Sequence, residues 1–132
     1  MDDIKLELID AARKVRDNAY APYSGFKVGA AIVAEDGSVY VGCNVENASY
    51  GLTTCAERNA IASLVAGGYK IPVSIAIAAK DGVFCPPCVA CRQVLMEFNP
   101  ELEIILESQG NGFKLFKLNE ILPLSFSTKD IS

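Results

Sequence analysis

Two cysteine motifs constrain this chain more than any other feature of its sequence. The first is Cys55-Ala56-Glu57-Arg58, and the second, about thirty residues later, is Pro87-Cys88-Val89-Ala90-Cys91-Arg92. Cys88 and Cys91 are three residues apart, so on one helical turn both sulfurs face the same side. Cys55 is predicted to begin another helix, so the three thiols meet only if two helix starts lie together. We therefore expect a fold that brings these two helix starts to one place.

Three thiols arranged in this way predict a zinc site. Thiolate sulfur is a common zinc ligand, and a zinc ion with three protein ligands keeps a fourth position open for water, as catalytic sites do. The chain contains no histidine that could fill that position. Glu57 lies two residues after Cys55, close enough to act on the water as a general acid and base. The motifs predict a catalytic zinc bound by Cys55, Cys88 and Cys91.

Two arginines lie close after predicted ligands in the sequence. Zinc with three thiolates carries a net negative charge, which weakens it as a Lewis acid. Arg58 lies just past the first ligand and Arg92 directly after the last, so either is placed to donate hydrogen bonds to the sulfurs. Our hypothesis is that Arg58 restores the acidity of the water at the metal.

The same cysteines allow other interpretations. Cys85-Pro86-Pro87-Cys88 has the same spacing and could supply ligands instead, although its two prolines would stiffen that pair outside a helix. A thiol redox protein would cycle Cys88 and Cys91 through a disulfide. A zinc-stabilised binding module would need a fourth protein ligand. We interpret Cys43 and Cys85 as plain thiols, buried and peripheral respectively.

Length and composition limit the class of protein. The chain has 132 residues and is 51% hydrophobic, which suits a single domain over residues 1–132. Its acidic start and the lack of an apolar run of about 18 residues argue against a signal peptide or a membrane span, so we expect a cytoplasmic protein. Five cysteines then indicate thiols in use as ligands rather than disulfides. A net charge of −4 and no basic cluster indicate that neither nucleic acid nor a membrane is a partner.

The hydrophobic pattern predicts an α/β fold. Apolar residues at three- and four-residue intervals predict an amphipathic first helix, and Thr54 is a candidate N-cap for the second. Helices are expected at 4–20, 55–66, 88–98 and 118–122, and strands at 26–34, 39–43, 73–79, 103–106 and 113–117. This order predicts three α/β/α layers around a five-stranded mixed sheet, with the site where helices begin beyond the strand ends.

Five segments, taken in order, resemble the cytidine deaminase family, specifically its small homotetrameric branch with three cysteine ligands. The segments are Ala21-Pro22-Tyr23-Ser24, residues 26–31, residues 42–50, residues 55–58 and residues 87–94. The resemblance covers most of the chain and implies a cytidine deaminase-like fold. It also implies hydrolytic deamination of cytidine and deoxycytidine to uridine and deoxyuridine, with release of ammonia, in pyrimidine salvage. Each subunit would hold one Zn²⁺ on the three cysteines, with Glu57 moving protons without being a ligand.

The resemblance further implies where a pyrimidine nucleoside would bind. Asn44 and Glu46 would hold the ribose hydroxyls, and Phe26 would pack on the pyrimidine ring. Tyr50 and Phe126 would serve the site of a neighbouring subunit in a homotetramer. Independently of the family, two polar residues two apart at a strand end point the same way and suit a pair of hydroxyls; a solvated turn is the alternative. The full set of implied substrate contacts is Phe26, Asn44, Glu46, Ala48, Tyr50, Ala56 and Phe126.

The chain departs from the family pattern in two places, Pro86 and Val89. The family usually has Ser-Pro-Cys-Gly-Ala-Cys where this chain has Pro-Pro-Cys-Val-Ala-Cys. A valine would strain a position of positive φ but not one inside a first helical turn. Within the deaminases, an enzyme acting on aminonucleoside antibiotics or nucleic acid is the alternative. The acidity of the chain and the pair Asn44 and Glu46 favour free nucleosides.

Overall fold

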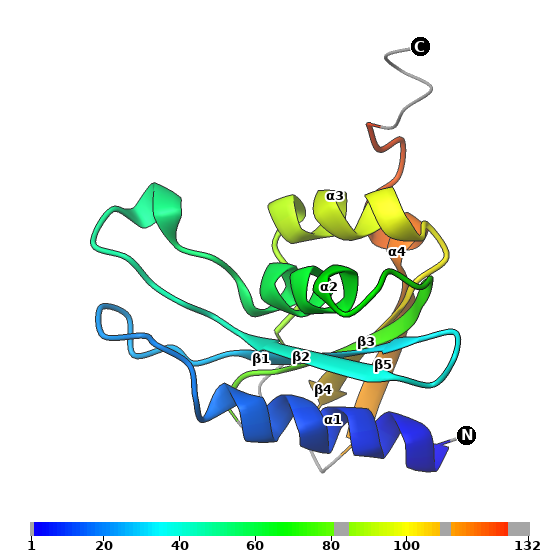
Figure 1. Ribbon diagram of the computed structural model, residues 1–132, viewed down its shortest axis with the longest axis horizontal. Coiled ribbons are helices and arrows are strands. Elements are labelled where there is room, and N and C mark those ends of the chain that lie inside the picture. Colours follow the sequence, from blue (N-terminus) through cyan, green and yellow to red (C-terminus); the bar gives the residue numbers. More distant parts are fainter. Residues whose placement is uncertain (1, 81–84, 109–111, 127–132) are drawn as a thin grey trace.

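A mixed five-stranded sheet forms the middle layer of the protein (Figure 1). The computed structural model describes residues 2–80, 85–108 and 112–126. The strand order is β2-β1-β3-β4-β5, in which β3 and β4 are parallel and the other neighbours antiparallel. The strands are β1 (Gly29–Ala34), β2 (Val39–Cys43), β3 (Pro72–Ala78), β4 (Glu103–Ser108) and β5 (Gly112–Lys117).

Helices cover both faces of this sheet. On one face, α1 (Asp2–Arg16) packs through Leu8 and Ala12 in a core cluster that contains Ala76 of β3. The opposite face carries α2 (Ala56–Ala66) and α3 (Val89–Phe98), as Figure 1 shows. The short α4 (Leu118–Ile121) follows β5, and a 3₁₀ turn, η1, spans Tyr50–Leu52. The predicted α/β/α layers and five-stranded mixed sheet are confirmed.

Two glycines allow the flanking helices to lie directly on the sheet. A Cβ atom at Gly29 of β1 would lie 2.0 Å from the Ala12 carbonyl oxygen of α1. A Cβ atom at Gly42 of β2 would lie 2.4 Å from the Ala60 nitrogen of α2. Because real Cβ contacts are not this short, each glycine fixes how closely its helix approaches. Gly42 therefore helps to set the position of α2, which begins at the first cysteine motif.

Several element boundaries differ from the predicted ones. The first helix ends at Arg16 instead of near residue 20, because the Asn18 and Ala19 amides bond to carbonyls three residues back and Tyr20 then pairs with the Asn44 carbonyl. The first strand begins at Gly29, not at residue 26. Thr54 is not the N-cap of α2, since Cys55 takes that place. Among the residues that the structure describes, no helix combines the length and apolarity needed to cross a bilayer.

Candidate metal and substrate site

Cys55 and Cys88 occupy equivalent positions at the starts of α2 and α3. Each is the N-cap residue, with extended backbone angles, so each helix begins one residue later than the sequence predicts. Helix N-termini carry free N–H groups and a partial positive charge that favour thiolates. The Cys88 sulfur also accepts a hydrogen bond from the Cys91 amide, at 3.5 Å. The prediction that two helix starts present the thiols is confirmed.

The three sulfur atoms lie at distances that suit one zinc ion. Cys88 Sγ is 3.2 Å from Cys91 Sγ and 4.0 Å from Cys55 Sγ, and all three sulfurs lie within 4.8 Å of one another. Tetrahedral zinc with Zn–S bonds of about 2.3 Å requires sulfur separations of about 3.8 Å. All five cysteines are described and are free thiols. The chemistry and spacing of these three fit the metal, and in the described residues no fourth cysteine or carboxylate joins them.

The charges around the cluster favour a thiolate at Cys55. The hydrogen bond from the Cys91 thiol and then the adjacent Arg58 guanidinium lower the pKa of Cys55 from 9.0 to about 5. The same hydrogen bond to Cys55, together with burial, raises the pKa of Cys91. Arg58 Nη2 donates to Cys55 Sγ at 3.3 Å. The predicted contact between Arg58 and a ligand sulfur is confirmed.

Glu57 lies against the thiols without joining them as a ligand in the cluster. Its side chain is 6% exposed, in the first turn of α2. Burial raises the pKa of Glu57, and the negative charge of Cys55 raises it further. A buried carboxyl group with a raised pKa holds a proton more readily than an exposed one, which suits a general acid and base.

Arg92 bonds away from the sulfurs, and Cys85 lies outside the thiol cluster. Of the two arginines placed to donate to the sulfurs, Arg58 does so, whereas Arg92 donates from Nε to the Pro87 carbonyl and from Nη1 to the Ile121 carbonyl. Cys85 packs against the main core and is half-buried, and burial raises its pKa. It lies outside the thiol cluster, which argues against the alternative ligand pair Cys85 and Cys88.

Val89 is accommodated without strain. It is the first residue of α3 and is exposed. In the described residues the non-glycine position with positive φ is Leu124, not Val89. The departure from the family pattern at Val89 therefore leaves the shape of the ligand turn intact.

Asn44 and Glu46 both hold the backbone of the loop before β1. Asn44 is 9% exposed; its Oδ1 accepts from the Val28 amide and its Nδ2 donates to the Phe26 carbonyl, both at 2.8 Å. Glu46 Oε1 accepts from the amides of Tyr23 and Ser24. The solvated-turn alternative is wrong for Asn44, which is buried and bonded. Each side chain keeps lone pairs or a second N–H for a further partner.

The other predicted substrate residues are mostly exposed. Glu46 and Tyr50 line a hollow of about 330 Å³ together with Tyr23, Ser24 and Thr53. Phe26 and Tyr50 are exposed, and so is Ala48 in the same loop region, whereas Ala56 is fully buried at the start of α2. Figure 1 shows the loops that carry Tyr23 and Tyr50 extending to one side of the sheet. Phe126 lies instead at the end of the described chain, beyond α4.

Sequence reasoning missed two polar residues that support this region. Ser24 donates to Glu46 Oε2 and accepts from the Phe26 amide. Asn59 donates from Nδ2 to the Cys43 carbonyl at 2.7 Å and to Thr54 Oγ1 at 3.1 Å, which ties the start of α2 to the end of β2. A signal existed for Asn59, which lies one helical turn after Cys55. Ser24 lies within one of the family motifs, but no local pattern predicts its pairing with Glu46, 22 residues away.

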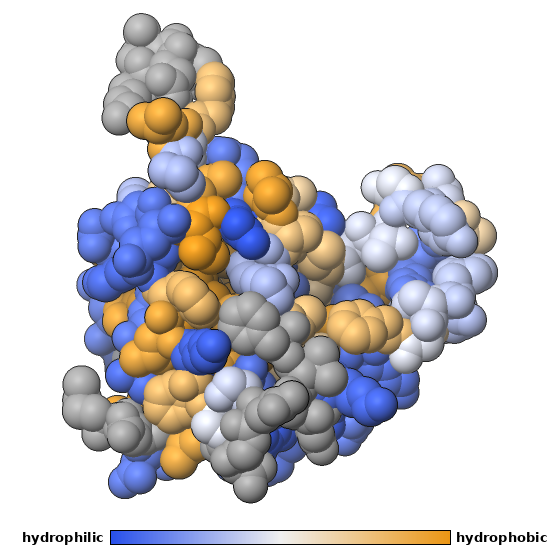
Figure 2. Space-filling view, turned by 180° about the vertical axis from the view of Figure 1, so that it is seen from behind, coloured by the Kyte–Doolittle hydropathy of each residue, from blue (hydrophilic) through white to orange (hydrophobic). Residues whose placement is uncertain are grey.

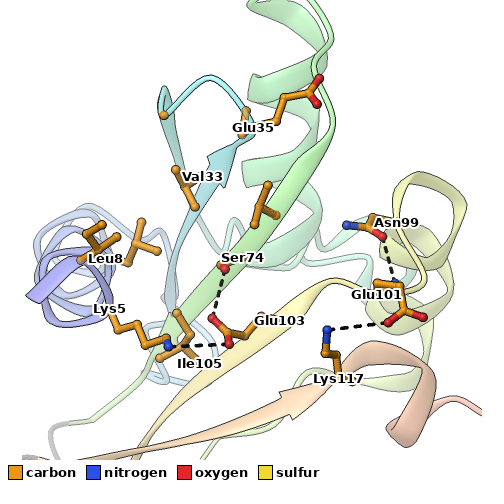
Figure 3. Close-up of a pocket in the computed structure, with 14 residues that line it drawn as sticks. Lys5, Leu8, Val33, Glu35, Ser74, Asn99, Glu101, Glu103, Ile105 and Lys117 are labelled. Atoms are coloured by element: carbon orange, nitrogen blue, oxygen red, sulfur yellow. Dashed lines mark hydrogen bonds and ion pairs between the residues drawn. The ribbon is translucent and has the colours of Figure 1, made fainter. Parts of the chain in front are cut away.

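A larger hollow lies at the opposite end of the sheet from the thiols. It measures about 550 Å³ and is lined by the N-terminal parts of α1, β3 and β4. Figure 3 shows several of its polar groups paired with one another, with Glu103 between Lys5 and Ser74, and Lys117 beside Glu101. The two lysines of this hollow are thus already paired with Glu103 and Glu101, whereas the candidate metal ligands and the buried Glu57 lie at the thiol cluster.

Comparison with known proteins agrees with this geometry. Residues 3–106 match the family model described as the cytidine and deoxycytidylate deaminase zinc-binding region, a span that contains all three thiols and Glu57. The chain belongs to this family. It is 41% identical over 127 residues to a cytidine deaminase of Sporosarcina psychrophila, covering 96% of this chain and 93% of the relative. It is 43% identical over 126 residues to that of Halalkalibacterium halodurans, covering 95% and 96%.

Solved structures of the deaminase family show the same fold. The crystal structure of cytidine deaminase from Burkholderia pseudomallei superimposes with a TM-score of 0.85 at 47% identity. The match covers 91% of this chain and 97% of that one. The fold, the zinc-binding region and the thiol cluster therefore agree in assigning this chain to the zinc-dependent cytidine deaminases.

Proposed function

We propose that this protein hydrolyses cytidine and deoxycytidine to uridine and deoxyuridine, with release of ammonia. The observation that carries the proposal is the placement of Glu57, buried beside the Cys91 and Cys55 thiols that, together with Cys88, can hold one zinc ion. The relatives named cytidine deaminases, aligned over nearly the whole chain, support the choice of substrate. Neither nucleic acid nor a membrane is proposed as a partner, in line with the acidic net charge of −4.

Each residue of the site has a separate role in the proposed reaction. Cys55, Cys88 and Cys91 would hold zinc, which supplies Lewis acidity that lowers the pKa of the attacking water. Glu57 takes a proton from that water as its oxygen bonds to C4 of the ring, and delivers the proton to N3. Glu57 then carries the second proton of that water, from the new C4 hydroxyl, to the amino group as the C4–N bond breaks, the C4 carbonyl forms and ammonia leaves. Water and cytidine thus give uridine and ammonia, with Glu57 returned to its starting state.

The substrate is oriented by the loops beside the thiols. Asn44 and Glu46 hold the ribose hydroxyls with the hydrogen-bonding capacity that their backbone contacts leave free. Phe26 packs on the pyrimidine, which agrees with its exposed ring. The Ala56 backbone and Ala48 contact the base and sugar. These roles are supported by the match of each residue to the family motif.

The working assembly is a homotetramer of single-domain subunits. Tyr50 is 78% exposed and Phe126 is 59% exposed, so both rings are available to another copy. Burying such large exposed aromatic rings favours association. Each ring contributes to a neighbour's pocket. We place the enzyme in the cytoplasm, in pyrimidine salvage, with one zinc per subunit.

The experiment that tests this function combines metal analysis with an ultraviolet deamination assay. Purified protein should contain one zinc per chain and should turn over cytidine and deoxycytidine. A cytosine-containing oligonucleotide and an aminonucleoside antibiotic serve as comparison substrates and should react far more slowly. Zinc-loaded protein that is inactive on both nucleosides but active on either comparison substrate would contradict the proposal.

A further inference from the structure

The helix that begins at Cys88 and carries Cys91 also bonds to the segment that follows β5. Directly after Cys91, Arg92 and Gln93 point to the segment that follows β5. Arg92 Nη1 donates to the Ile121 carbonyl at 2.8 Å, and Gln93 Nε2 donates to the Phe126 carbonyl at 2.9 Å. Both contacts cross about thirty residues of sequence. One turn of α3 is therefore bonded to two points of the C-terminal segment.

Arg92 joins that segment to the ligand turn. Its Nε donates at 2.9 Å to the carbonyl of Pro87, a buried residue that directly precedes Cys88. The Ile121 carbonyl belongs to the last residue of α4, where carbonyls lack intrahelical partners. The planar guanidinium holds two acceptors in a fixed relative geometry. Arg92 and Ile121 also line a small hollow of about 170 Å³ together with the apolar Leu106 and Phe116.

Between α4 and residue 126, where the described chain ends, there are few apolar anchors. We call residues 122–126 the C-terminal arm. Leu122 packs against the core, but Leu124 is fully exposed, with a positive φ of 54°. Figure 2 shows the arm standing out from the body, with apolar side chains at its surface. Polar contacts to α3 therefore matter for its direction more than they would for a packed segment.

We propose that Arg92 and Gln93 are positioning residues that set the direction of the C-terminal arm and so place the Phe126 ring. This inference rests on the proposed function, in which that ring closes a neighbouring subunit's nucleoside pocket. Because both residues stand on the turn that holds Cys91, one rigid element orients the thiols of its own subunit and the aromatic wall of the next. Arg92 acts on two carbonyls, and Gln93 on the arm alone.

The kinetic test compares Gln93→Ala and Arg92→Gln with Glu97→Gln, a matched control at an exposed position of the same helix. Loss of one hydrogen bond, worth about 1 kcal/mol, should raise the KM for cytidine about fivefold in Gln93→Ala. Its kcat should change less than twofold and its zinc content not at all, because the ring contacts the substrate and not the reacting atoms. Arg92→Gln should also lower kcat, and Arg92→Lys, which can reach one carbonyl, should fall between.

A fluorescence test follows the arm directly, without activity. The chain contains no tryptophan, so Phe126→Trp introduces a single reporter at the arm. Its emission anisotropy should fall when Gln93→Ala or Arg92→Gln is added, and should not change with Glu97→Gln. Unchanged anisotropy in both arm variants would overturn the proposal. An unchanged KM for cytidine in Gln93→Ala would also overturn it, and so would a joint loss of kcat and zinc in that variant. If the parent protein failed to deaminate nucleosides, the proposed function would fail while anisotropy still tested the positioning.

Discussion

Arg58 donates a hydrogen bond to the sulfur of Cys55, 3.3 Å away and three residues earlier in the chain. The contact joins the guanidinium to the thiolate that begins the same helix. Hydrogen bonds to ionised groups are among the stronger ones in proteins, and they withdraw charge from their acceptor. Arg58 therefore offsets part of the negative charge that three thiolates place on a metal.

The first prediction concerns the pH dependence of turnover. We expect Arg58→Gln to retain its zinc and to move the acidic limb of the rate profile toward higher pH. The reason is that the thiolates, no longer neutralised, leave the attacking water less acidic. Arg58→Lys, which keeps the charge, should shift the limb less. A full zinc complement with an unaltered profile in Arg58→Gln would show that the contact has no such role.

The second prediction concerns the thiols of the metal-free protein. The pKa of Cys55 is lowered from 9.0 to about 5, first by the Cys91 thiol and then by Arg58. Thiolate absorbance should therefore rise by one equivalent around pH 5 as the pH increases, because an acid with a lowered pKa ionises earlier. Cys55→Ser should abolish this step, and Cys43→Ser, at a thiol outside the cluster, should leave it. A titration in which every thiol ionises near pH 9 would disprove the assignment.

The third prediction concerns Asn44, whose side chain bonds to the backbone on both sides of Lys27. Asn44→Ala leaves the Val28 amide and the Phe26 carbonyl without these partners, at a cost of about 1–3 kcal/mol for a buried group. Urea unfolding should show this loss, and the KM for cytidine should rise because Phe26 is no longer held. Asn44→Asp can still accept from Val28 but cannot donate to Phe26, so it should also bind substrate poorly. Wild-type stability in Asn44→Ala would contradict the structure.

The fourth prediction uses the contact between β2 and α2. Gly42→Ala would place a Cβ 2.4 Å from the Ala60 nitrogen and push α2 away from the sheet. Overpacking of this kind costs about 1–3 kcal/mol, occasionally more. Because α2 starts at Cys55, zinc affinity should fall together with the urea midpoint. Gly51→Ala is the matched control, since a Cβ there meets nothing within 4 Å. Equal urea midpoints for Gly42→Ala and Gly51→Ala would contradict this prediction.

The metal-binding residues were predictable because their signal is local. The spacing of Cys88 and Cys91 fixes two sulfurs on one turn, and a helix start explains Cys55. Periodicity likewise gave the three layers, since strands buried on both faces, such as β3, read as apolar runs. The N-cap positions of Cys55 and Cys88 were missed by one residue, within the usual uncertainty of helix ends.

The contacts that could not be predicted join residues distant in sequence. Arg92 was one of two candidate donors to the sulfurs because it follows Cys91, but it bonds to Ile121, 29 residues away. The early end of α1 depends on the pairing of Tyr20 with Asn44, which only the folded chain brings together. Local pattern specifies the elements, whereas tertiary hydrogen bonds decide where they stop and which side chains they hold.

The central claim is that Glu57 moves the protons at a site whose three cysteines hold the zinc. The measurement that tests it most directly is the zinc content and kcat of Glu57→Ala, determined on the same preparation with Glu97→Gln as the exposed control. We predict one zinc per chain in both proteins and a kcat for Glu57→Ala about 10²–10⁴-fold lower on cytidine, the range expected for loss of a general acid and base. A zinc-loaded Glu57→Ala protein that deaminates cytidine at the parent rate would contradict the account.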